Sequence, residues 1–303
     1  MARVIFLACA LVISAVTLAA QQAPAFRAGI DAVSLSVTAL DAQRRLVTDL
    51  QQSEFGIFED GVRQEVTFFA RRQQPIALSI LLDSSASMEH HLPTLQAAAS
   101  NFVGRLKPQD IAQVVDFDSR VEIRQPFTGN QSELQAAIKQ TVAGGSTSLY
   151  NALYIALREL QKIRAVTESD IRRQALIVFS DGEDTSSLVT IDEVMDLAKR
   201  SDTVVYTIAL RGGDTESRRF REAEFIMRQL ADGTGGRWFF PAKIQDLDAV
   251  YAQIADELAS QYTVGYVSAN ARRDGAWRRI NIVLARPDVT PRARQGYYAP
   301  RSR

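Results

Sequence analysis

The chain is poor in cysteine and histidine, which excludes several kinds of site. Its 303 residues include one cysteine, Cys9, and two histidines, His90 and His91. One cysteine leaves no partner for a disulfide, and the two histidines lack a third ligand at zinc spacing. The glycine-rich phosphate loop and the dinucleotide-binding fingerprint do not occur either. The sequence therefore does not predict a disulfide framework, a zinc site or a nucleotide site of these two kinds.

A surplus of charge is also lacking. The 35 Lys and Arg residues balance the 35 Asp and Glu residues, and the arginine pairs are scattered along the chain. Nucleic-acid binding depends on a continuous basic surface, so we expect no nucleic-acid partner. The composition, 46% hydrophobic and 23% charged, is that of a globular protein and excludes disorder. The length suits one large domain with a small companion.

The first 20 residues are typical of an export signal. Arg3 provides a positive start, Val4 to Val16 is almost wholly apolar, and the segment Thr17-Leu18-Ala19-Ala20 offers small residues for cleavage. We expect a periplasmic or secreted protein that begins near Gln21 and does not span the membrane once the signal is cleaved. Cys9 would leave with the signal. A retained anchor is the alternative, since an apolar run of about 17 residues lies at the lower limit for spanning a membrane.

From Pro75 to Gln261 strand-like and helix-like segments alternate. The segment Ile76 to Leu82 is almost unbroken in its apolar character, as in a strand covered by helices on both faces. Further strands are expected at Ile111–Val115, Ala175–Phe179 and Val204–Leu210, and helical stripes run over Leu95–Leu106, Leu153–Ile163 and Leu247–Leu258. This order predicts an α/β fold with a doubly wound, mostly parallel sheet and helices on both faces.

The two flanks of this region have strand patterns. Residues 27–72 include an alternating segment from Val33 and an expected hairpin, Phe55 to Phe69, around the turn Glu59-Asp60-Gly61. After Leu258, strands are expected at Tyr262–Val267 and Trp277–Leu284. Neither flank can bury much surface alone. We therefore expect residues 21–74 to form an N-terminal β segment, residues 75–261 the α/β domain, and residues 262–303 a C-terminal segment that pairs with 27–72.

Oxygen-bearing side chains follow three of the expected strands. The first strand leads into Asp83-Ser84-Ser85-Ala86-Ser87. The strand Ala175 to Ser180 is followed by Asp181-Gly182. A third loop, Gly144-Gly145-Ser146-Thr147, precedes a helix. Ligands of open α/β sheets bind at the carboxyl ends of the strands. Carboxylates and hydroxyls together are ligands for Mg²⁺, Mn²⁺ or Ca²⁺ rather than for zinc or copper.

The same residues carry a family resemblance. The segment Asp83 to Ser87 matches the D-x-S-x-S motif of the von Willebrand factor A domain, and Thr147 and Asp181 fall where that family has its remaining metal-site residues. The resemblance extends over residues 75–261. It implies a sheet of six strands and an intact metal-ion-dependent adhesion site, or MIDAS.

The family also implies roles for the five residues. Ser85, Ser87 and often Thr147 contact the ion directly, whereas Asp83 and Asp181 act largely through waters. In such sites the open coordination position accepts a carboxylate oxygen of a protein partner. Magnesium is the expected ion, with manganese or calcium as alternatives.

The flanks resemble a group of exported bacterial proteins described as VWFA-related and best known from acidobacteria. The similar segments are Phe55–Gly61, Val264–Tyr266, Gly275–Arg278 and Arg294–Tyr298. This resemblance implies full-length membership of the group and supplies no mechanism.

Two main classes of function remain open. The first is a binding module that holds an Asp or Glu of a partner at the metal. The second is a metal-assisted hydrolase, which needs a positioned base or a second metal. No His or Lys lies in the three loops, and Asp116 and Asp118 are interpreted as capping a hairpin. We expect a binding protein with no catalytic residues; a structural or assembly subunit of an envelope complex is a further alternative.

Overall fold

The computed structural model describes residues 32–71, 74–163, 172–181, 183–209, 218–241 and 243–301. The expected export signal, residues 1–20, lies outside these ranges. Within them, no helix combines the length and the apolar character needed to cross a membrane.

A six-stranded sheet with the order β10-β9-β8-β5-β6-β7 forms the centre of the α/β region. Its strands are β5 (Ile76–Asp83), β6 (Ile111–Phe117), β7 (Val121–Thr128), β8 (Arg173–Ser180), β9 (Val204–Ala209) and β10 (Trp238–Phe239). Neighbouring strands are parallel except for β7, which runs antiparallel to β6. Every residue of β5 is buried, as the unbroken apolar run predicts.

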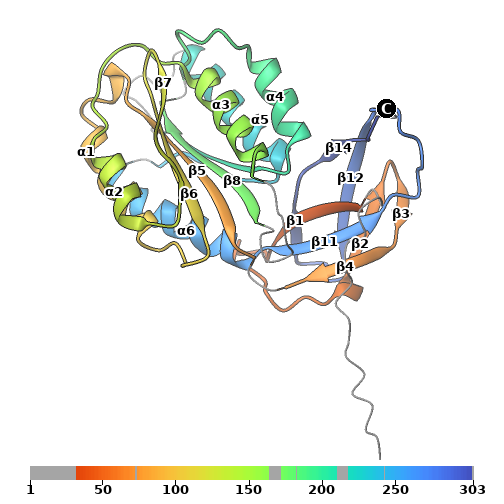
Figure 1. Ribbon diagram of the computed structural model, residues 1–303. Helices are drawn as coiled ribbons and strands as arrows, with labels where there is room; N and C mark the ends of the chain where they lie inside the picture. The colour runs from red at the N-terminus through yellow and green to blue at the C-terminus, as the bar shows by residue number, and fades with distance from the viewer. Residues whose placement is uncertain are drawn as a thin grey trace, which may run out of the picture. The chain divides into compact units, whose positions relative to one another are not determined.

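Helices cover both faces of this sheet (Figure 1). Helices α1 (Leu92–Val103), α2 (Gln131–Lys139) and α6 (Leu247–Ser260) pack on one face, and α3 (Leu149–Gln161), α4 (Ile191–Arg200) and α5 (Arg218–Thr234) on the other. Leu78 and Ile80 of β5 belong to the first core, and Ala77 and Leu81 to the second. The doubly wound, mostly parallel fold with six strands is thereby confirmed.

Three of these helices, α2, α4 and α5, were not predicted. The buried stripe of α4 is only Val194, Leu197 and Ala198, which is too short for a clear helical period. A capping signal was present, however. Thr190 and Glu193 form a capping box in which the amide of Thr190 donates to Glu193 at 2.8 Å.

The flanks form two four-stranded sheets, with the orders β13-β1-β11-β4 and β14-β12-β2-β3. The N-terminal strands are β1 (Ala32–Leu40), β2 (Phe55–Glu59), β3 (Val62–Gln64) and β4 (Val66–Ala70); the C-terminal strands are β11 (Tyr262–Val267), β12 (Trp277–Leu284), β13 (Thr290–Arg292) and β14 (Gly296–Tyr298). β1 pairs with β11, and β2 with β12. Leu35, Ile57 and Tyr262 share one core. Short 3₁₀ helices lie at Gln52–Glu54, Ala86–Met88 and Ile244–Asp246.

The expected hairpin Phe55–Phe69 is shorter than predicted. β2 and β3 pair across a turn in which Asp60 and Gly61 have φ angles of 48° and 84°, the left-handed conformation that such two-residue turns require. β4 then leaves this sheet and pairs with β11 in the other. There the ring of Phe69 stacks on Tyr262 with a centroid distance of 5.9 Å. Aromatic burial between distant segments therefore overrides the local hairpin.

A buried polar cluster joins α6 to the flanking β sheets. The hydroxyl of Tyr206 on β9 donates to Glu257 of α6 at 2.7 Å, and Arg292 of β13 forms an ion pair with the same carboxylate. Arg173 of β8 donates both to the carbonyl of Leu258 in α6 and to the hydroxyl of Thr263 in β11, each at 3.1 Å. The cluster ties the end of α6 to both β13 and β11.

Tyr206→Phe is expected to lower the free energy of unfolding by about 1–2 kcal/mol, because the buried carboxylate of Glu257 loses a donor. Urea unfolding at neutral pH measures the loss. Tyr154→Phe is the control, since the Tyr154 hydroxyl has no hydrogen bond in the described part of the chain. Equal losses in the two variants would show that the Tyr206 hydroxyl contributes nothing specific.

Candidate metal centre

The predicted metal-site residues lie at the carboxyl ends of two neighbouring parallel strands. Asp83 is the last residue of β5, and Asp181 follows the last residue of β8. The register of the pair sets Leu82 opposite Phe179, so both chains leave the sheet at the same level. This is the position at which open α/β sheets bind ligands.

Asp83 lies fully buried at the base of the site. One carboxylate oxygen accepts the amide of Ser85 at 2.9 Å, and the other accepts the hydroxyl of Ser180 at 2.5 Å. Burial raises the pKa of Asp83 to about 6; the nearby charge of Asp181 adds to this, while the bonds from Ser180 and Ser85 oppose it. A cation beside this carboxylate would favour its charged form.

Two hydroxyls and a second carboxylate converge above Asp83. The hydroxyl oxygens of Ser85 and Ser87 lie 3.1 Å apart, and the Ser87 hydroxyl donates to Asp181 at 2.6 Å. An octahedral Mg²⁺ with ligands at about 2.1 Å has neighbouring ligand oxygens about 3 Å apart. The 3.1 Å distance between the two hydroxyls is close to that spacing, whereas the 2.6 Å distance is that of a short hydrogen bond. Ser85 is buried and Ser87 is exposed, so the row of oxygens runs from the interior to solvent.

Backbone hydrogen bonds bring the Thr147 loop to the same place. The amide of Gly144 donates to the carbonyl of Ser84 at 2.7 Å, and that of Ala86 donates to Gly145 at 3.1 Å. Gly145 has a φ of 71°, a conformation that favours glycine. On the other side, the amide of Thr147 donates to the Thr185 hydroxyl at 2.9 Å. The structure therefore holds all three predicted loops together, although no hydrogen bond joins the Thr147 side chain to the row of oxygens.

Sequence reasoning missed two residues that support the site. Ser180 holds Asp83, and Thr185 joins the loop after Asp181 to Thr147. The signal for Ser180 was available, because a polar residue ends an otherwise apolar strand immediately before Asp181. Thr185 had no local signal, since its role depends on a loop about 40 residues away.

The other candidate residues have different surroundings. His90 is exposed beyond the 3₁₀ helix at Ala86–Met88. Asp116 forms an ion pair with Arg124 at 3.0 Å, and Asp118 accepts the amide of Arg120 at 2.7 Å in the turn between β6 and β7. Within the described ranges, no three His, Cys, Asp or Glu side chains cluster as metal ligands. The candidate site therefore has two carboxylates, supplemented by hydroxyls.

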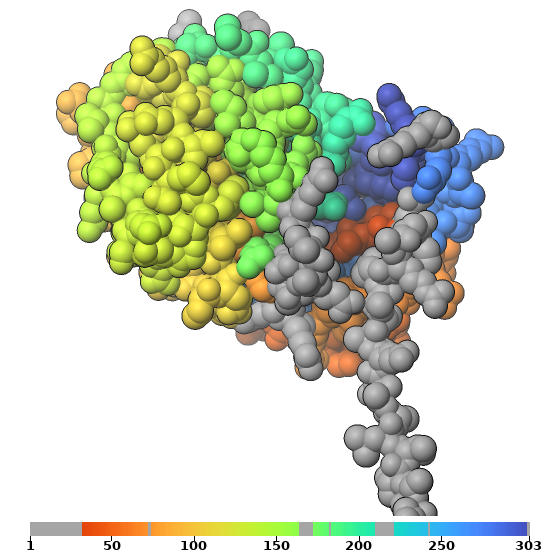
Figure 2. All heavy atoms as spheres, viewed as in Figure 1, coloured from red at the N-terminus to blue at the C-terminus, as the bar shows by residue number. Residues whose placement is uncertain are grey.

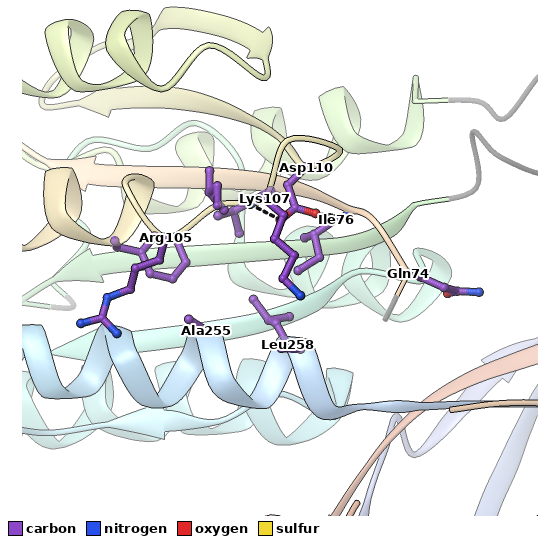
Figure 3. Close-up of a pocket in the computed structure, with 11 residues that line it drawn as sticks. Gln74, Ile76, Arg105, Lys107, Asp110, Ala255 and Leu258 are labelled. Atoms are coloured by element: carbon purple, nitrogen blue, oxygen red, sulfur yellow. Dashed lines mark hydrogen bonds between the residues drawn. The ribbon is translucent and has the colours of Figure 1, made fainter. Parts of the chain in front are cut away.

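A separate cavity lies at the opposite end of β5, where Ile76 begins the strand (Figure 3). Its volume is about 50 Å³. Asp110 accepts the amides of Ile76 and Lys107 beside it, both at 2.9 Å. Small-molecule pockets are usually about 300 Å³ or more. This cavity is too small to serve as a ligand site.

Comparison with known proteins supports the interpretation of the fold. Residues 78–183 match the sequence model of the von Willebrand factor type A domain, a range that includes all five candidate ligands. The chain contains a von Willebrand factor type A domain. The part of this vWA domain that matches the sequence model runs from β5 to just beyond the end of β8.

Solved structures share this fold at low sequence identity. A von Willebrand factor type A protein from Catenulispora acidiphila is 10% identical, with a TM-score of 0.52, over 91% of this chain and 76% of that one. A mutant of the PilB minor pilin from Streptococcus sanguinis is 12% identical, with a TM-score of 0.52, over 63% of each chain. At these identities the likeness concerns the fold alone.

An uncharacterised protein of Synechocystis sp. is similar in sequence. It is 29% identical over 115 residues, which make up 37% of this chain and 26% of that protein. The matched segment thus spans about a quarter of the relative.

Proposed function

We propose that the protein is an exported binding module that uses a divalent cation to hold an acidic residue of a protein partner. Asp83, Ser85, Ser87, Thr147 and Asp181 would hold the cation, with Mg²⁺ favoured over Mn²⁺ or Ca²⁺. The observation that carries this proposal is the row of oxygens from Ser85, Ser87 and Asp181, spaced at 3.1 and 2.6 Å and open to solvent at Ser87.

The hydrogen bonds of Asp83 support a role for a partner's carboxylate at the cation. Both oxygens of Asp83 already accept bonds, from Ser85 and Ser180, which favours an indirect role for this carboxylate. The direct ligands supplied by the chain are then mostly neutral hydroxyls. A divalent cation held by these neutral hydroxyls would be electrophilic, because the ligands balance only part of its positive charge. A carboxylate from a partner provides the missing negative charge, and the interaction is strengthened where water is partly excluded.

The surroundings of the site favour binding over hydrolysis. A hydrolase needs a base directed at the attacking water. Asp116 and Asp118 are engaged by Arg124 and by the amide of Arg120, and His90 is exposed on the following turn. None of these side chains is hydrogen-bonded to the row of oxygens in the described part of the chain. We therefore propose that the protein is not an enzyme.

Export is supported by residues 1–20, with their positive start, apolar run and small residues before Gln21. The PilB minor pilin, named as a pilus component, has a similar fold. An envelope or secreted location suits a module that binds other proteins, and it remains part of this proposal. N-terminal sequencing of the protein recovered from the envelope and the culture medium tests it: a start near Gln21 is expected, and an intact Met1 contradicts cleavage.

Replacing both serines, Ser85→Ala with Ser87→Ala, is expected to weaken Mg²⁺ or Mn²⁺ binding by more than about a hundredfold, because two direct ligands are lost. Calorimetric titration of the full chain measures this. The exposed Ser132→Ala is the control and should bind like the wild type. An unchanged titration of the double variant contradicts the metal assignment, provided that its circular dichroism matches the wild type.

A further inference from the structure

The N-terminal half of β1 has an edge that no described strand covers. β11 pairs with Ala32–Val37 on one side, whereas on the other side β13 pairs only with Thr38–Leu40. The carbonyl of Ser34 accepts a bond from the guanidinium of Arg294 at 2.8 Å, so it points away from β11. Backbone groups alternate between the two edges of a strand. Those of Ala32 and Ser36 therefore lie on the same uncovered edge.

A cleft of about 600 Å³ adjoins this edge. Its walls are the start of β1, the end of α4 and the C-terminal segment that includes β14. Figure 1 places α4 beside β14, and Figure 2 shows the teal segment that includes α4 meeting the dark-blue C-terminal segment on the surface. The volume is within the range of ligand-binding clefts, and the cleft is distinct from the candidate metal centre.

Positive charge dominates the lining of the cleft. Its charged side chains are Lys199, Arg200, Asp202, Arg294 and Arg301. Arg294 forms an ion pair with Asp202, and Arg200 pairs with Asp196 at 2.7 Å. Lys199 and Arg301 form no salt bridge with any residue in the described ranges. Arg301 therefore has no acidic partner among the described residues of the cleft, and Lys199 has only a through-space interaction with Asp196, whose main partner is Arg200.

Aromatic rings hold two of the cations at the wall. The guanidinium of Arg200 lies over the ring of Tyr298 at 4.0 Å, and the ammonium of Lys199 lies 5.8 Å from the ring of Trp277. Trp277 and Tyr298 contact each other edge to face at 5.0 Å. This arrangement restricts the side chains of Lys199 and Arg200. Less side-chain entropy is therefore lost when a ligand binds to them.

We propose that this cleft binds an extended segment of another protein that carries at least two Asp or Glu residues. The main chain of the segment displaces the guanidinium of Arg294 from the Ser34 carbonyl and pairs with the edge at Ala32, Ser34 and Ser36. Its carboxylates contact Lys199 and Arg301. The five residues from Ala32 to Ser36 span about 13 Å, enough for four or five residues of an added strand. Only a polypeptide presents the regular amide and carbonyl groups that such an edge pairs with, which favours it over a polysaccharide or a nucleic acid.

The test uses the full chain, EDTA and a fluorescent seven-residue peptide in which glutamate alternates with valine. EDTA prevents capture of the glutamates by a metal ion. Lys199→Glu with Arg301→Glu is expected to weaken peptide binding at least tenfold. Lys139→Glu is the matched control, because Lys139 is an exposed cation in the last turn of α2. Two modified peptides, one with glutamine in place of glutamate and one N-methylated on alternate amides, should each bind at least tenfold more weakly to the wild type.

Several results would overturn the proposal. They are equal binding of the glutamine peptide, equal binding of the N-methylated peptide, an undiminished affinity of the folded double variant, or tighter binding of heparin or a single-stranded oligonucleotide than of the peptide. The N-methylated peptide needs no variant, so a folding defect cannot obscure the answer. The Ser85→Ala, Ser87→Ala variant should bind the peptide normally. Failure of the cleft and failure of the metal centre are therefore distinguishable.

Discussion

Gly236→Ala is expected to lower the free energy of unfolding by about 3 kcal/mol or more, and to prevent folding if the protein is only marginally stable. A Cβ atom at Gly236 would lie 1.9 Å from the carbonyl oxygen of Val205 and 2.7 Å from its carbonyl carbon. Val205 is on the buried strand β9, so the obstructing atoms belong to backbone that cannot move without breaking the sheet. The chain must therefore separate β9 from the segment that enters β10.

Gly233→Ala is the matched control for this prediction. Gly233 lies near the end of α5, and a Cβ there meets no atom within 4 Å. Alanine replaces glycine in a helix with a gain of roughly 0.5–1 kcal/mol, so this variant should be as stable as the wild type or more so. Soluble yield and urea unfolding measure both variants. A Gly236→Ala protein as stable as Gly233→Ala would contradict the close packing of this segment on β9.

Glu59→Gln is expected to lower the free energy of unfolding by about 3 kcal/mol at neutral pH. The carboxylate of Glu59 is buried at the end of β2 and accepts bonds from Ser268 at 2.6 Å, Arg278 at 3.1 Å and the hydroxyls of Tyr266 and Tyr297 at 2.8 and 2.9 Å. The Arg278 side chain is 3% exposed. Removal of the negative charge leaves this buried guanidinium without its main partner.

The effect of Glu59→Gln should depend on pH. Burial opposes ionisation of Glu59, but the bonds from Ser268, Tyr266, Arg278 and Tyr297 outweigh it and lower the pKa of the carboxyl below its usual value. A carboxyl with a lowered pKa stabilises the folded state above its unfolded pKa, near 4.3, and loses that contribution as the pH falls through the folded pKa. The difference between wild type and variant should be full above about pH 5 and shrink in more acidic buffer.

Urea unfolding at pH 7, 5 and 3.5 checks this dependence. Glu54→Gln is the control, since Glu54 pairs with the partly exposed Arg286, and its loss should lower the free energy of unfolding much less than Glu59→Gln. A difference between wild type and Glu59→Gln that stays constant over the pH range would show that the charge of Glu59 is not what stabilises the β sheets.

The α/β class could be predicted because its signals are local. The fully apolar segment Ile76 to Leu82 required cover on both faces, and the helical stripe from Leu247 to Leu258 became α6 with little change in its bounds. The short helices α2 and α4 were missed, since their buried stripes of three residues each are too brief for a clear period. Their capping residues were the stronger signal. β13 and β14, of three residues each, are likewise defined by pairing rather than by pattern.

The candidate metal centre was largely accessible from the sequence. Asp83, Ser85 and Ser87 lie within five residues, and parallel strands deliver Asp181 to the same edge. The convergence of the oxygens of Ser85, Ser87 and Asp181, at 3.1 and 2.6 Å from one another along the row, required the folded loops. Metal binding itself, the identity of the ion and the ligand roles of all five residues stay predictions.

Local composition and periodicity were thus sufficient for the types of secondary structure, the order of the elements and the oxygen-rich loops. They contained no information on the ion pair of Glu59 with Arg278, two residues 219 positions apart. Nor did they indicate that β13 pairs with only three residues of β1, so that part of the edge of β1 has no neighbouring strand among the described residues. The reason is physical. Periodicity indicates which face of a segment is buried. Strand register and ion pairing depend on which distant segment packs against that face, and this is decided only when the whole chain packs together.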